Sequence, residues 1–139
     1  MRAAEYFQNG FSCSESLIKW AIDEGLVSED LLAVATPFSG GMGVGCLCGA
    51  IAGAQMIIGS LYGKNNKFGN ENIARAKAKE LVQRFTEKHN ATCCRVLTRG
   101  LEMASPERKA HCVNMVNDCE KIVKDLLNSE KLGILNKDV

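Results

Sequence analysis

The chain has 139 residues, of which 46% are hydrophobic and 24% are charged. This composition is typical of one folded globular domain and excludes an intrinsically disordered chain. The 17 basic and 16 acidic residues nearly cancel, and their spread along the chain leaves no basic face for nucleic acid. We therefore expect a single domain over residues 1–139 and no nucleic-acid partner.

The first part of the chain predicts short helices separated by turns. Apolar residues recur at helical spacing and rarely alternate, so we expect an all-α fold. A short helix is expected over residues 3–7. Ser12 and Glu15 form a capping box that opens the next helix, and Gly25 closes it. A third helix is expected from Ser28, which is placed to cap it.

A long segment without charged side chains follows between Asp30 and Lys64. Pro37 ends the preceding helix, a glycine-rich loop covers residues 40–45, and an uncharged helix extends to about Tyr62. The segment is long enough to span a membrane, but glycine and alanine fill much of it. We therefore predict no membrane span, and a buried Gly/Ala-rich central helix in a bundle of about five helices.

Glycines recur every fourth residue near the start of this helix, at Gly45, Gly49 and Gly53. Each interior glycine costs about 1 kcal/mol of helix stability relative to alanine, so the pattern needs another reason. We expect these glycines to let another helix or a cofactor approach the backbone closely.

Two longer helices are predicted in the second half of the chain. Residues 70–89 form an amphipathic helix with a charged, solvent-exposed face. A short element at residues 93–98 leads to a long helix, which Ser105 caps and Pro106 begins. The buried stripe of this long helix comprises Cys112, Met115, Val116, Cys119, Ile122, Val123 and Leu126. A loose tail is expected from about residue 129.

Cysteine is the residue type that most strongly indicates a function. The seven cysteines are Cys13, Cys46, Cys48, Cys93, Cys94, Cys112 and Cys119. The N-terminus has no apolar segment typical of a secretory signal, so we expect a cytoplasmic protein in a reducing environment. There, cysteines in a chain that can build its own core favour metal binding or thiol chemistry over disulfides. Two or three of the seven can instead pack as small buried side chains.

The predicted helices place several cysteines at or near helix N-termini. Cys13, Cys48 and either Cys93 or Cys94 lie where free N–H groups and the helix dipole favour a thiolate and lower its pKa. Residues two apart on a helix point about 200° apart, so Cys46 and Cys48 cannot both face one site from a helix. The adjacent Cys93 and Cys94 have the same difficulty. We expect one member of each pair to carry chemistry and the other to pack.

The last two cysteines share one helix face. Cys112 and Cys119 stand two turns, about 10.5 Å, apart, which exceeds the α-carbon separation of a disulfide. One of them is therefore expected in the core. The sequence contains no Cys-x-x-Cys, which disfavours a thioredoxin-like site and a ribbon-type zinc site.

Four cysteine-containing segments follow one another in the order FSCSESL, GGMGVGCLCGAIAGA, CCRVL and AHCVNMV. From Tyr6 to about Leu127 the chain thereby resembles the C_GCAxxG_C_C family of redox-active proteins. The resemblance implies an all-helical fold, a redox role and four signature cysteines, Cys13, Cys48, Cys94 and Cys112. It leaves Cys46, Cys93 and Cys119 as departures that either pack or act as additional ligands.

Three kinds of chemistry fit four thiols from separate segments. The first is an iron–sulfur cluster for electron transfer, which a related domain in split-Soret cytochromes carries. The second is dithiol/disulfide exchange without metal. The third is a structural zinc site in an interaction or sensor protein. Under the first two kinds of chemistry, the chain is an oxidoreductase or an electron-transfer accessory protein, and its redox partner is an unidentified protein. The apolar glycine face can also pack against a second copy of the chain and form a homodimer.

Overall fold

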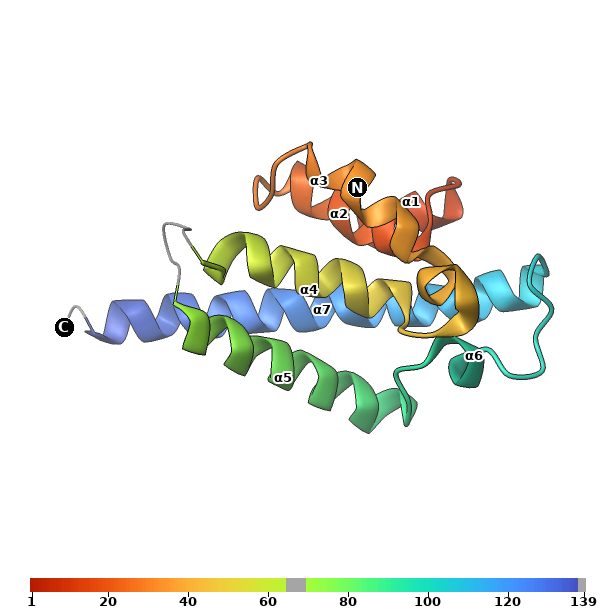
Figure 1. The fold of residues 1–139 in the computed structure, drawn as a ribbon. Helices are drawn as coiled ribbons and strands as arrows, with labels where there is room; N and C mark the ends of the chain where they lie inside the picture. The colour runs from red at the N-terminus through yellow and green to blue at the C-terminus, as the bar shows by residue number, and fades with distance from the viewer. Residues whose placement is uncertain (65–69, 138–139) are drawn as a thin grey trace.

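The computed structural model describes residues 1–64 and 70–137. Within these residues the chain forms seven α-helices and no strand, which confirms the predicted all-α class. The helices are α1 (Ala3–Gln8), α2 (Cys13–Asp23), α3 (Leu31–Ala35), α4 (Gly49–Tyr62), α5 (Glu71–His89), α6 (Cys94–Leu97) and α7 (Pro106–Lys137). Figure 1 shows α4 running alongside α7, with α1 and α2 on one side of this pair and α5 on the other.

Helix α4 lies in the middle of the bundle. It packs against α2, α5 and α7 and carries no charged side chain that would need water. Its apolar side chains join those of the neighbouring helices in one core, in which Leu17, Ile57, Phe85 and Val116 are completely buried. No helix within the described residues has both the length and the apolar character that a membrane crossing requires.

Helices α2 and α4 meet across two glycines that are one helical turn apart. A Cβ atom at Gly53 would lie 2.8 Å from the carbonyl oxygen of Ser14. A Cβ atom at Gly49 would overlap the Sγ atom of Cys13 and lie 3.0 Å from the carbonyl oxygen of Phe38. These two glycines therefore let α2 approach α4 closely, and Gly49 also makes room for a cysteine sulfur.

Replacing Gly53 with alanine is expected to lower the free energy of unfolding by about 1–3 kcal/mol, because the methyl group would overlap the backbone of α2. Gly49→Ala should cost a similar amount and displace Cys13. Gly59→Ala, in the same helix, meets no atom within 4 Å and should stabilise the fold by about 0.5–1 kcal/mol. Urea unfolding measures all three. Equal effects at Gly53 and Gly59 would contradict this packing.

The loop between α3 and α4 contains a run of residues in the left-handed region. The φ angles of Gly40, Gly41, Met42 and Gly43 are 62, 63, 61 and 74°. Gly41 requires glycine for a second reason, since a Cβ atom there would lie 2.7 Å from the Cβ atom of Cys94. The loop therefore packs against the start of α6, and this contact positions Cys94.

Local signals in the sequence place some helix ends correctly and one incorrectly. The capping box is confirmed, because the Ser12 hydroxyl accepts the Glu15 N–H and the Glu15 carboxylate accepts the Ser12 N–H. The expected start of the third helix at Ser28 is wrong, since α3 begins at Leu31. The Ser28 hydroxyl instead accepts the N–H of Asp30, which forms a turn ahead of the helix.

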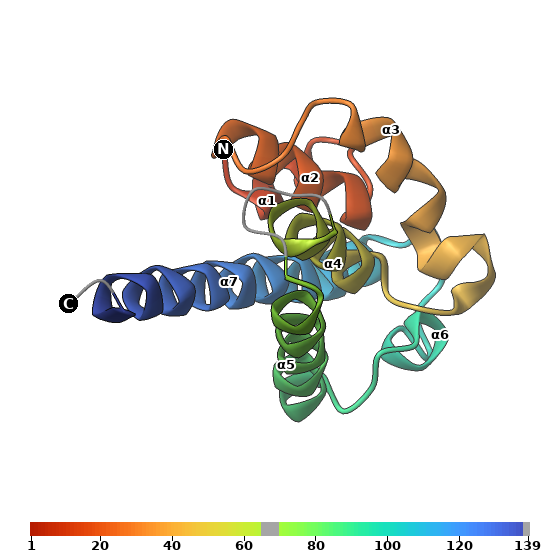
Figure 2. The same ribbon diagram turned by 60° about the vertical axis from the view of Figure 1, so that its left-hand side comes forward.

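Helix α7 is the longest element of the fold. It continues to Lys137, through the region expected to be a loose tail from about residue 129. Once a helix has formed, each added residue gains a hydrogen bond, and no proline interrupts this stretch. Figure 2 shows the C-terminal part of α7 projecting beyond the other helices.

Candidate functional site

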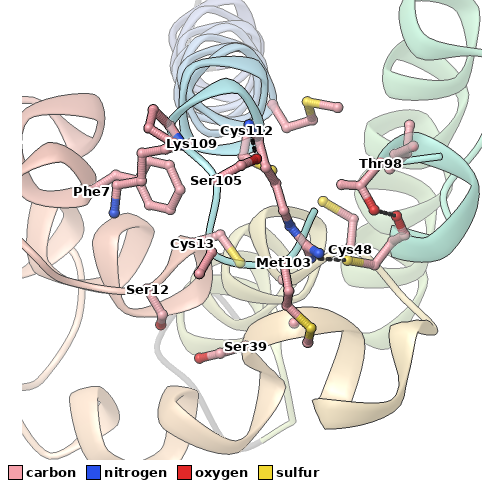
Figure 3. A pocket seen from close by; sticks show the side chains of 18 residues that line it. Phe7, Ser12, Cys13, Ser39, Cys48, Thr98, Met103, Ser105, Lys109 and Cys112 are labelled. Carbon is pink, nitrogen blue, oxygen red and sulfur yellow. Dashed lines mark hydrogen bonds between the residues drawn. The ribbon is translucent and has the colours of Figure 1, made fainter. Parts of the chain in front are cut away.

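A cavity of about 530 Å³ lies where the N-terminal parts of α2, α4 and α7 approach α6. Four cysteines from these four segments line it, namely Cys13, Cys48, Cys94 and Cys112. Figure 3 looks into this cavity, with Cys13 on α2 and Cys112 on α7. Cofactor and small-molecule sites commonly have volumes of about 300–1,000 Å³. The fold thus brings the thiols of four separated segments to a cavity of cofactor size.

Helices or helix ends carry all four of these thiols. Cys13 is the first residue of α2, immediately after the Ser12 cap, and Cys48 directly precedes α4. Cys94 is the first residue of α6, and Cys112 lies in the second turn of α7. Sites built on rigid elements hold their groups at defined positions. Packing of the helices around α4 therefore fixes the arrangement of the thiols.

Backbone hydrogen bonds between two segments bring Cys48 and Cys94 to the same cavity. The Cys48 N–H donates to the carbonyl of Thr92 at 2.8 Å, and the Cys94 N–H donates to the carbonyl of Cys46. The two segments form an isolated antiparallel bridge. Cys93 is extended and its thiol donates to the carbonyl of Gly45, whereas Cys94 begins α6 and lines the cavity.

Burial makes these thiols difficult to ionise. Burial raises the pKa of Cys48 to about 12, although backbone hydrogen bonds from Ile51 and Ala50 oppose the rise. Burial also raises the pKa of Cys13 and of Cys112. The predicted lowering of the pKa at helix N-termini is therefore wrong for Cys13 and Cys48. The expected N–H groups are present, but the loss of hydration outweighs them.

The four sulfur atoms are also close enough to influence one another's charge. A thiolate at Cys94 raises the pKa of Cys13, Cys48 and Cys112, and a thiolate at Cys13 raises the pKa of Cys48 and Cys112. Like charges in one site oppose each other's ionisation. Together with burial, this coupling keeps Cys13, Cys48 and Cys112 protonated at neutral pH unless a positively charged group joins them.

Two basic side chains of α7 also line the cavity. The Arg108 guanidinium donates to the Sγ atom of Cys94 at 3.4 Å and opposes the rise that burial causes in the pKa of Cys112. The Nζ atom of Lys109 lies 3.9 Å from the centroid of the Phe7 ring. Arg108 is not among the expected site residues. The available signal is its position four residues before Cys112, on the same helix face.

The other three cysteines line no part of this cavity. Cys46 is exposed, and the Cys93 thiol donates to the carbonyl of Gly45 at 3.1 Å. Cys119 is completely buried in the core, where burial raises its pKa. Of Cys112 and Cys119, which share α7, only the first lines the cavity. One cysteine of each pair therefore lines the cavity, where the pairs are Cys46 and Cys48, Cys93 and Cys94, and Cys112 and Cys119.

The three glycines expected to admit a helix or a cofactor have different surroundings. Gly49 lines the cavity and contacts Cys13, whereas Gly53 is covered by α2. Gly45 belongs to the loop before α4, and its nearest neighbour is the side chain of Arg95. Two of these glycines, Gly49 and Gly53, therefore serve the contact between α2 and α4. The three glycines do not form one continuous face toward the cavity.

Comparison with known proteins identifies the family. A family model described as "Putative redox-active protein (C_GCAxxG_C_C)" matches residues 11–126, a range that contains the four cysteines of the cavity. The chain is similar to an uncharacterized protein of Archaeoglobus fulgidus, with 28% identity over 115 residues and 76% of each chain covered. No solved structure matches it. Since the family model matches most of the sequence, the chain belongs to the C_GCAxxG_C_C family of redox-active proteins.

Proposed function

We propose that this protein binds an iron–sulfur cluster through Cys13, Cys48, Cys94 and Cys112 and transfers electrons. The observation that best supports this proposal is that these four thiols, from four segments, line one cavity. Cysteine thiolates are the usual ligands of iron–sulfur clusters, four for each cluster. A bound cluster would supply a centre that accepts and releases single electrons.

The arrangement of the thiols around a cavity favours a cofactor of several atoms over a single metal ion. Among the described side chains, no three His, Cys, Asp or Glu residues are placed to hold one metal ion. A zinc ion needs each sulfur ligand about 2.3 Å away, whereas here the thiols surround a cavity of about 530 Å³. The geometry therefore supports a cluster better than the structural zinc site.

The chain's own groups can compensate the charge of four thiolates. Backbone hydrogen bonds from Gly40 and Ser14 oppose the rise that burial causes in the pKa of Cys13. Arg108 places a positive charge beside Cys94. Hydrogen bonds and charges near the sulfurs also set the reduction potential of a cluster. Because burial keeps several of the thiols protonated, loading the site must release protons.

A second candidate function is dithiol/disulfide exchange without metal. It is supported by the position of Arg108, which contacts Cys94 and opposes the rise that burial causes in the pKa of Cys112. A guanidinium shared by two thiols favours the thiolate that such exchange requires. Both cysteines are free thiols in the structure.

Ultraviolet–visible spectroscopy of anaerobically purified protein distinguishes these functions. A cluster gives visible absorption bands that fade on reduction. A dithiol protein is colourless and contains two thiols that are lost together on mild oxidation, whereas a zinc site is colourless and contains one zinc per chain. A protein that stays colourless and metal-free after anaerobic reconstitution with iron and sulfide would refute the proposed cluster.

A further inference from the structure

A second cavity, of about 510 Å³, lies beside the first. Three arginines line it, Arg95, Arg99 and Arg108. Cys94 and Arg108 line both cavities, so the two cavities share a wall. The second cavity contains neither Cys13, Cys48 nor Cys112. It is therefore a basic cavity that reaches the candidate site from the side of Cys94.

The charges of these three arginines are not matched by acidic side chains. In the part of the chain that the structure describes, none of the three pairs with a carboxylate. The other three arginines of the sequence each form an ion pair with a carboxylate, namely Arg2, Arg75 and Arg84. Like charges that line one cavity repel each other. An anion bound between them would relieve this repulsion.

The wall of the second cavity holds Arg95 in place and leaves room for a ligand. The Arg95 Nη2 atom donates to the carbonyl of Val44 at 2.9 Å. A Cβ atom at Gly45 would lie 3.3 Å from the Nε atom of Arg95, so the side chain lies flat against the loop. A guanidinium has five N–H donors, and this contact leaves most of them for another acceptor. Gly43 and Gly100 also line the cavity without adding a side chain.

We propose that the second cavity binds a small oxyanion and holds it beside Cys94. Carboxylate, phosphate and sulfur oxyanions share the paired oxygen atoms that a guanidinium binds with two parallel hydrogen bonds. Three unmatched positive charges favour an anion with more than one negative charge. The site is defined by Arg95, Arg99 and Arg108, none of which is a proposed cluster ligand.

Isothermal titration calorimetry with inorganic phosphate, sulfate and succinate tests this site, with ionic strength held constant by sodium chloride. At least one of the three anions is expected to bind the wild-type protein. Arg99→Gln should weaken that binding about tenfold or more, because it removes a charged hydrogen-bond donor. Arg75→Gln removes the same charge from α5, outside the cavity, and should leave the affinity unchanged.

Two results would overturn the proposal. One is the absence of binding by all three anions. The other is an equal loss of affinity in both variants, which would mean that net charge alone attracts the anion. Amide chemical shifts in the titrated protein provide the location, since those of Gly43, Gly45 and Gly100 should move while those of α5 stay constant. Neither measurement requires a cluster, so failure here is distinct from failure of the proposed function.

Discussion

Replacing any one of Cys13, Cys48, Cys94 or Cys112 with serine is expected to abolish the visible absorption of protein reconstituted anaerobically with iron and sulfide. Each of these residues contributes one of the four thiols that line the cavity. Soft thiolate ligands select iron–sulfur clusters, and a serine hydroxyl is a poor substitute. The loss should be nearly complete in every variant. Absorption spectra together with iron and sulfide content measure it.

Two cysteines outside the cavity provide matched controls for this experiment. Cys46→Ser changes an exposed residue two positions from Cys48, and it should leave the absorption at the wild-type level. Cys119→Ser should do the same, because Cys119 is buried in the core and does not line the cavity. Circular dichroism identifies variants that fail to fold. Equal loss in Cys46→Ser and Cys48→Ser would show that the assignment of the ligands is wrong.

Local sequence signals are sufficient to predict most of the helices. Ser12 and Glu15 satisfy the free N–H groups at the start of α2, and this requirement is the same in any fold. The uncharged stretch of α4 can be stable only where other helices cover it, so its composition alone indicates a buried helix. Ser28 misleads because its hydroxyl stabilises a turn as well as it would cap a helix.

The composition of the cavity depends on contacts between residues that are distant in sequence. The choice between Cys93 and Cys94 is made by hydrogen bonds to the segment around Cys46, and nothing near Cys93 reveals that pairing. The effect of Gly49 on Cys13 likewise requires the packing of α4 against α2. Sequence spacing can indicate that one member of a cysteine pair carries chemistry, but tertiary contacts decide which one.

The direction of the thiol pKa shifts is the property that helix position alone predicts wrongly. Free N–H groups at the start of α4 do lower the pKa of Cys48, as its position indicates. Cys48 is, however, only 7% exposed, and an ion loses more from lost hydration than it gains from two hydrogen bonds. How deeply a helix end is buried is a property of the assembled fold, and the sequence of the helix does not contain it.

The stability of the metal-free protein is expected to fall steeply as the pH rises above 9. Burial raises the pKa of Cys48 from its ordinary value of 9.0 to about 12 in the folded state. Above pH 9 the unfolded chain therefore loses this proton while the folded chain keeps it. Because the unfolded state then binds fewer protons, the free energy of unfolding decreases with pH, by about 1.4 kcal/mol per pH unit from Cys48 alone. The loss continues to about pH 12.

Urea unfolding under reducing conditions at pH 8, 9 and 10 measures this slope. Other groups that ionise above pH 9 contribute equally to matched variants, so the comparison that matters is between Cys48→Ala and Cys46→Ala. The Cys48→Ala variant should be less stable at pH 8, because it leaves a small cavity, but its stability should fall less between pH 9 and 10. Cys46→Ala is the matched control, because it removes an exposed cysteine that does not line the cavity. If the free energy of unfolding falls equally with pH in both variants, the Cys48 thiol ionises as easily in the folded protein as in the unfolded chain. That result would contradict its buried position in the cavity wall.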